Sequence, residues 1–136
     1  MDFLKSMMVA ASGLKAQSGR MKIIAENIAN ADSTGRTAQD EPYRRKVPTF
    51  SSRLDSEMGV NLVKLGKVEK DRTEFNSRYE PGHPAANAEG YVKTPNVNVM
   101  IETVDMKEAQ RTYEANLNII SSTRQMLQRT IDILRG

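Results

Sequence analysis

Residues 2–31 read DFLKSMMVAASGLKAQSGRMKIIAENIANA, and this stretch decides the fold. It contains no proline, and its apolar side chains recur at alternating steps of three and four residues, the spacing of one face of a helix. Ser18 is the polar member of that series. The pattern predicts a helix whose apolar seam is formed by Leu4, Met7, Ala11, Leu14, Met21, Ala25 and Ile28.

The end of the chain repeats this spacing and predicts a second helix over residues 99–135. Its seam includes the polar residues Gln110 and Arg124, which we interpret as residues that set the register of helix packing. The apolar members of this second seam are Tyr113, Leu117, Ile120, Leu127, Ile131 and Leu134. A neighbouring line suits the close approach of another helix because its side chains are small or polar: Ala109, Asn116, Thr123 and Thr130.

Residues 32–98 lie between the two predicted helices and contain all five prolines and five of the eight glycines. The helical period is lost there, and the sequence EPGHP at residues 80–84 is typical of a turn. We interpret this region as a small β-rich insertion with strands near residues 43–47, 60–65 and 91–94 and loops at 31–42 and 81–90. Residues 1–31 and 99–136 are then the N-terminal and C-terminal assembly helices of one discontinuous domain.

The predicted helices are too long for a compact domain of this size. At 1.5 Å per residue they would measure about 45 Å and about 55 Å, whereas a globule of this chain length has a diameter of roughly 37 Å. We therefore expect a mainly α protein whose two helices pair as an antiparallel or staggered coiled coil, with the central β and loop region protruding. Such a pair leaves apolar lines uncovered, which predicts an association surface: Met8, Ile24, Ile119 and Ile133.

The composition argues against most enzyme classes. The 136 residues include no cysteine and one histidine, so thiolate metal sites, cysteine nucleophiles and histidine-based catalytic sets are hard to build. His83 lies in the predicted turn, and Glu80 and Glu89 make at most a weak metal site with it. We expect no catalytic, cofactor-binding or metal-binding residues.

The net charge of +3 is spread thinly along the chain: +2 over residues 1–30, +1 over 31–98 and 0 over 99–136. This distribution gives no clear footprint for a polyanion. The run Arg44-Arg45-Lys46 nevertheless leaves a second hypothesis open, a small basic helical nucleic-acid-binding protein. The commoner explanation of such a run beside Asp40 and Glu41 is a solvated face.

Several motifs carry a family resemblance. ASGLKAQ at residues 11–17 and IAENIANADS at 24–33 closely resemble the N-terminal signature of bacterial flagellar rod and hook proteins. PYRRK at 42–46, YEPGHP at 79–84 and GYVKTPNVNV at 90–99 are similar to the proximal-rod branch of that family, as is the ending from Tyr113 onward. The positions that carry the N-terminal motif are Ser12, Gly13, Leu14, Gln17, Asn27, Ala29 and Asn30.

The resemblance implies a non-enzymatic structural subunit of the flagellar basal-body rod. Such subunits assemble with copies of themselves and with other rod proteins into a hollow, torque-transmitting drive shaft in the periplasm. The family also implies contact with the base of the rod and ring assembly, without nucleic acid or membrane insertion. Asn27 and Asn30 have two open interpretations, helix C-terminal punctuation in the left-handed conformation and subunit packing.

The resemblance further implies export through the flagellar type III gate without a cleavable signal. The sequence agrees, because it shows no signal peptide and no stretch of about 20 apolar residues. Phe50 and Leu54 match the Phe-x-x-x-hydrophobic element read by the export gate, and Phe3-Leu4 is a candidate for the accompanying hydrophobic stretch. A buried Phe and Leu at the end of a strand would explain Phe50 and Leu54 equally well.

Overall fold

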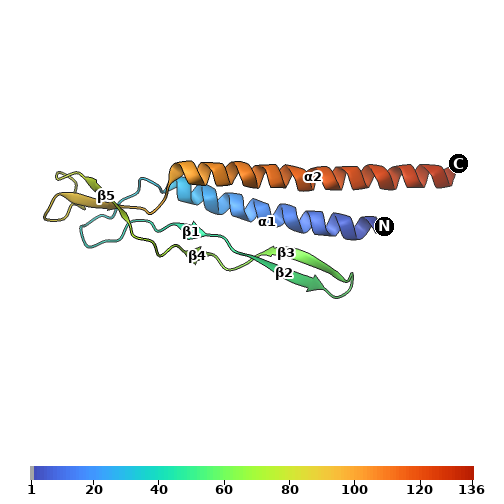
Figure 1. Ribbon diagram of the computed structural model, residues 1–136, viewed down its shortest axis with the longest axis horizontal. Coiled ribbons are helices and arrows are strands. Elements are labelled where there is room, and N and C mark those ends of the chain that lie inside the picture. The colour runs from blue at the N-terminus through green and yellow to red at the C-terminus, as the bar shows by residue number, and fades with distance from the viewer. Residues whose placement is uncertain (1) are drawn as a thin grey trace. The chain divides into compact units, whose positions relative to one another are not determined.

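The computed structural model describes residues 2–136 and contains two long helices and six short strands (Figure 1). The strands pair as three separate two-stranded antiparallel sheets, β1–β4, β2–β3 and β5–β6. The predicted helices are confirmed to within two residues at each end. In chain order the elements are α1 (Phe3–Ala29), β1 (Lys46–Val47), β2 (Phe50–Asp55), β3 (Val60–Leu65), β4 (Glu69–Lys70), β5 (Asn76–Tyr79), β6 (Tyr91–Thr94) and α2 (Val99–Arg135).

The chain divides into two compact units, and each helix contributes to both. The first unit consists of residues 2–21, Thr49–Lys67 and Lys107–Gly136. The second consists of Lys22–Pro48 and Val68–Met106. None of the helices in residues 2–136 is long and apolar enough to cross a membrane.

In the first unit α1 and α2 run antiparallel and approach closely through small residues. Gly13 contacts the side chain of Asn116, and two turns further on Arg20 pairs with Glu108 at 3.6 Å. Ala10 and Ala109 are buried. The prediction that the two long helices pack together is therefore confirmed. The predicted coiled coil through the large apolar seams is not, because the small-residue line makes the contact.

Gly13 permits this close approach, since a Cβ atom at this position would lie 2.8 Å from Nδ2 of Asn116. We expect Gly13→Leu to lower the free energy of unfolding by about 1–3 kcal/mol, because the added side chain overlaps Asn116 and forces this side chain or the helices to shift. Urea unfolding followed by circular dichroism measures this. Gly82→Leu is the control, because a Cβ there would meet no atom within 4 Å. Equal stability of the two variants would contradict the close approach.

The β2–β3 hairpin belongs to the first unit and packs along α1. The amide of Val63 donates to Oγ of Ser12 at 3.1 Å, and Leu65 lies against Gly19. For residues 49–67 the prediction of a protruding central region is therefore wrong. The helix covers apolar side chains of β3, which an isolated two-stranded hairpin would expose to water. The strand predicted near residues 60–65 is confirmed, whereas β2 was not predicted.

The second unit holds the remaining two sheets and its own small core. The predicted strand at residues 91–94 is confirmed as β6, whose side chains alternate between exposed and buried, with Val92 fully covered. Only Lys46–Val47 of the predicted strand at 43–47 is regular, and β4 and β5 were not predicted. The core of this unit includes Ile23, Ile24, Ala85, Val92 and Val97. Ile24 was expected to remain uncovered, and this is wrong because it is 2 % exposed.

Candidate assembly surfaces

The apolar seams predicted on the helices are covered only in part. None of their thirteen residues is buried. On α1 the buried positions Ala10, Ile24 and Asn27 lie one residue before the seam positions Ala11, Ala25 and Ile28, so the inward face is rotated by about 100° from the predicted one. The exposed members of the two seams are Leu4, Ala11, Ala25, Leu117, Leu127, Ile131 and Leu134, and the half-buried ones are Met7, Leu14, Met21, Ile28, Tyr113 and Ile120.

The C-terminal part of α2 is one of two strongly exposed apolar segments of this helix, the other being residues 99–104 at its beginning. In the first unit Leu127 lines a shallow pocket with Phe3, at the beginning of α1, so α2 extends beyond the end of α1 (Figure 1). We call residues 128–135 the α2 tail. Ile133 and Leu134 in this tail are 78 % and 82 % exposed. Gly136, with a φ of 79°, ends the helix in the left-handed conformation that favours glycine.

Asn27 of the N-terminal motif organises the second unit from inside the helix. Its side chain is 1 % exposed and makes four hydrogen bonds. Nδ2 donates to the carbonyl of Lys46 at 2.8 Å and to Oε2 of Glu102 at 3.2 Å. Oδ1 accepts from the hydroxyl of Tyr43 at 2.8 Å and from the amide of Lys46 at 2.9 Å. Asn27 therefore joins α1, β1 and α2, and its interpretation as helix punctuation is wrong.

Glu102 is also 1 % exposed and forms an ion pair with Arg45. The same guanidinium lies 3.3 Å from Asp71 and 4.0 Å from Asp105. The amide of Arg45 donates to Oδ1 of Asn96 at 2.8 Å. Although burial acts against it, the pairing with Glu102 raises the pKa of Arg45. The amide of Thr73 is the largest cause that lowers the pKa of Asp71, with Arg45 a smaller one.

The basic run at residues 44–46 is therefore not a solvated face. Arg44 donates to the carbonyls of Asp71 and Thr73 and stacks over the ring of Phe75 at 4.1 Å. Lys46 pairs with Glu26 at 3.0 Å. All three cations of the run are engaged within the second unit, which leaves the nucleic-acid hypothesis without its basic patch.

The other motif residues have distinct local roles. Ser12 receives the hairpin, and Gly13 admits Asn116. Asn30 does punctuate the helix end, because its Nδ2 donates to the carbonyl of Glu26 at 2.8 Å. It does not use the left-handed conformation, since no residue other than glycine among residues 2–136 has a positive φ. Leu14 is half-buried and Ala29 exposed, and the side-chain oxygen of Gln17 is buried without a hydrogen-bond partner in the described part of the chain.

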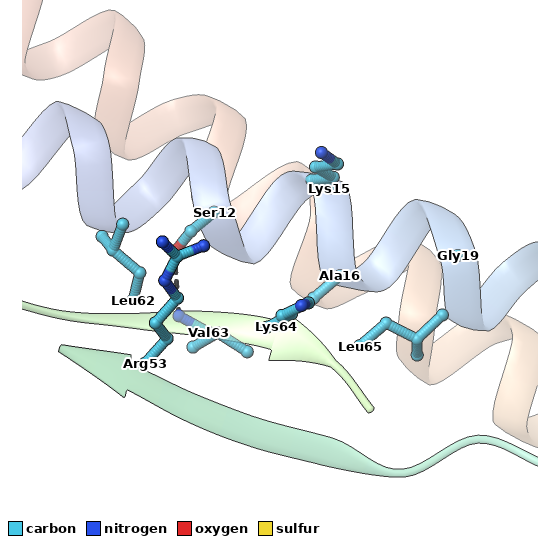
Figure 2. Close-up of a pocket in the computed structure, with 9 residues that line it drawn as sticks. All are labelled: Ser12, Lys15, Ala16, Gly19, Arg53, Leu62, Val63, Lys64 and Leu65. Carbon is cyan, nitrogen blue, oxygen red and sulfur yellow. Dashed lines mark hydrogen bonds between the residues drawn. The ribbon is translucent and has the colours of Figure 1, made fainter. Parts of the chain in front are cut away.

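A groove of about 440 Å³ lies between α1 and the β2–β3 hairpin in the first unit (Figure 2). Leu62 and Leu65 extend from β3 toward the helix, and Arg53 rises from β2. The helix side of the groove is lined by Ser12, Ala16 and Gly19.

Phe50 and Leu54, the predicted export element, lie on one face of β2 and are 45 % and 62 % exposed. The alternative that they are buried strand-end residues is therefore wrong. The export role stays a prediction.

His83 is a loop residue, as predicted. Its Nδ1 accepts from the amide of Ala85 at 3.0 Å, so Nε2 carries the proton toward Oγ1 of Thr34 at 3.3 Å. Glu80 pairs instead with Arg78 at 2.8 Å. Within residues 2–136 no three histidine, aspartate or glutamate side chains are grouped as a metal site.

Two segments of this chain, each containing most of one long helix, match known protein families. Residues 7–36 match a family described as flagella basal body rod protein, and residues 88–133 match one described as flagellar basal body rod FlgEFG protein C-terminal. The chain is 54 % identical to the flagellar basal-body rod protein FlgC of Agrobacterium fabrum over 128 residues, which cover 94 % of this chain and 92 % of that protein. The chain belongs to the FlgC family. It is also 40 % identical to FlgC of Bacillus subtilis, with 98 % and 99 % covered, and 39 % identical to FlgC of Salmonella typhimurium, with 92 % of each covered.

Each of the two segments that match rod families contributes one partner of the buried pair between Asn27 and Glu102. The first segment also carries Ser12 and Gly13, which receive the hairpin and α2. In this member of the FlgC family the motif residues therefore hold α1, α2 and the intervening strands together within each unit. The large apolar side chains of the seams are left for other contacts.

Proposed function

We propose that this chain is a structural subunit of the bacterial flagellar basal-body rod. It assembles with copies of itself and with other rod proteins through its two terminal helices. The observation that carries the proposal is the apolar surface of the helices, above all the α2 tail, where Ile133 and Leu134 are 78 % and 82 % exposed. Contiguous apolar surface of this kind marks sites of protein association.

Burial between subunits supplies the energy of assembly. Covering one exposed leucine or isoleucine completely contributes about 1.5–3 kcal/mol, and the helices present several such side chains. When each subunit contacts the next through two different surfaces, and the rotation between neighbours does not close a ring, the result is an open helical assembly. Stiffness then arises from many close-packed contacts along the helices, which suits a shaft that transmits torque.

We further propose the finer parts of the function, which the resemblance to the family supports. The subunit belongs to the proximal part of a hollow rod in the periplasm, contacts the base of the rod and ring assembly, and acts without cofactor or catalysis. It reaches the rod through the flagellar type III export gate while unfolded. Phe50 and Leu54 then act as the element that the gate reads, with Phe3-Leu4 as the hydrophobic stretch. Phe50 and Leu54 are 45 % and 62 % exposed, so burial in the core of the first unit does not account for these two apolar residues.

The test introduces charge at the exposed tail. Ile133→Glu combined with Leu134→Glu is expected to abolish incorporation into the rod, because both carboxylates would have to be buried between subunits. The stability of the free chain should change by less than about 0.5 kcal/mol, since both side chains are already in water. Co-sedimentation with other rod proteins and swimming of a complemented strain that lacks its own FlgC provide the measurements.

Gln128→Glu combined with Thr130→Glu is the matched control, because it adds the same charge to polar exposed positions of the same tail. The control chain should retain most of its incorporation. If the chain with Ile133→Glu and Leu134→Glu swims and co-sediments as well as the wild type does, the proposed function is contradicted.

A further inference from the structure

The groove between α1 and the β2–β3 hairpin combines an apolar lining with positive charge. Ala16, Leu62 and Leu65 line it together with three cations, Lys15 from α1, Lys64 from β3 and Arg53 from β2. None of the three cations takes part in an ion pair among residues 2–136. An occupant of matching chemistry therefore presents apolar side chains and carboxylates together.

The turn of the same hairpin has that chemistry. Residues 54–58 read LDSEM, with two carboxylates and no cation. Leu54 is 62 % exposed, and Glu57 is exposed and forms no ion pair within residues 2–136. Oδ1 of Asp55 accepts the amides of Glu57 and Met58, both at 3.1 Å, so the turn is held in one conformation. We call residues 54–58 the hairpin tip.

A hairpin tip cannot enter the groove of its own chain. The strands that end in the tip also form one wall of the groove, from Arg53 and Leu62 to Leu65 (Figure 2). Folding the tip back between that wall and α1 would break the β2–β3 pairing that closes at Asp55 and Val60. The matching tip therefore comes from a second molecule.

We propose that the hairpin tip of one copy of this chain docks in the groove of a second copy. Leu54 and Met58 cover the apolar lining, and Glu57 lies beside Lys15 and Lys64. The two surfaces differ, so the contact is head-to-tail and repeats from one copy to the next. This inference rests on the proposed function, because it names one contact by which copies of the subunit adjoin in the rod.

The absence of cysteine from the sequence permits a direct test by disulfide formation between two chains. One full-length chain carries Ser56→Cys in the tip, and a second, distinguished by a size tag, carries Leu62→Cys in the groove. They are mixed under conditions in which the wild-type chain sediments as an assembly, and oxidised briefly. We expect the mixed disulfide to form at least about fivefold faster than with a partner carrying Ser77→Cys, an exposed position on β5.

Charge reversal supplies the second arm. Glu57→Lys in the tip chain should slow mixed-disulfide formation about fivefold or more, and Lys64→Glu in the groove chain should restore it. Added salt should slow formation of the mixed disulfide by the wild-type pair of charges, since these charges are exposed.

Equal rates for the Leu62→Cys and Ser77→Cys partners, or no restoration by Lys64→Glu, would overturn the docking. The proposed function would still stand in that case if the wild-type chain sediments as an assembly. Capture of a different rod protein by the Leu62→Cys chain, without the second copy, would overturn it as well. Failure of the wild-type chain to assemble with itself or any rod protein would instead count against the proposed function.

Discussion

Asn27→Leu is expected to lower the free energy of unfolding by about 4 kcal/mol, although leucine has a similar volume. The asparagine is 1 % exposed and pairs with Tyr43, Glu102 and both backbone groups of Lys46. Leucine would remove the partner of all of these buried or part-buried groups, while Glu102 keeps its ion pair with Arg45. Each polar group left unsatisfied costs about 1–3 kcal/mol. The expected total loss is smaller than the sum of these single costs, because the Tyr43 hydroxyl can rotate toward water.

Chemical unfolding of the full chain measures this effect, with Asn30→Leu as the matched control. Asn30 is half-buried and makes a single side-chain bond, to the carbonyl of Glu26, so its loss should cost about 1 kcal/mol. A loss below about 1 kcal/mol for Asn27→Leu would mean that the Asn27 network does not stabilise the second unit. The comparison separates the two asparagines of the motif, which sequence alone treats alike.

The helices were predictable because their apolar period extends over many turns. The face of α1 that packs on α2 was not, since large apolar side chains appeared to be the natural contact. The structure instead uses Ala10, Gly13 and Ala109, because small side chains let two backbones approach closely. The line of small residues on α2 was visible in the sequence and marks the true contact. A large apolar seam in the sequence therefore does not by itself mark the face that packs inside the chain.

The strands were predicted only where the sequence alternates clearly, as in β3 and β6. β4 and β5 lack that signal, because their side chains are exposed on both faces and their pairing partners decide their conformation. The polar network was out of reach for a different reason. Asn27 and Glu102 are 75 residues apart, and no spacing rule predicts that two polar residues so distant in the sequence form a hydrogen bond. The one available signal was the basic run at residues 44–46, which belongs to an alternating segment and therefore sends Arg44 and Arg45 to opposite sides.

Arg45→Met is the second variant with a large expected effect, a loss of about 3 kcal/mol in the free energy of unfolding. The guanidinium lies within 4.0 Å of Glu102, Asp71 and Asp105. Its removal leaves the Glu102 carboxylate buried without a cation and beside two like charges. Arg44→Met is the control and should cost about 1 kcal/mol, because Arg44 bonds only neutral carbonyls and an aromatic ring.

Two further measurements identify the carboxylates as the cause. Adding Glu102→Met to Arg45→Met should recover at least about 1.5 kcal/mol, since an apolar pair can replace a buried ion pair. The pKa of Asp71 is lowered in the wild type, so its contribution to stability is present above the unfolded value near 3.9 and is lost as the pH falls through the lower folded value. Removal of Arg45 takes away one cause of that lowering. The difference in the free energy of unfolding between the wild type and Arg45→Met should therefore narrow as the pH falls below about 3.9. A deficit that stays constant down to pH 3 would show that lost packing of the Arg45 side chain, rather than uncompensated charge, destabilises the variant.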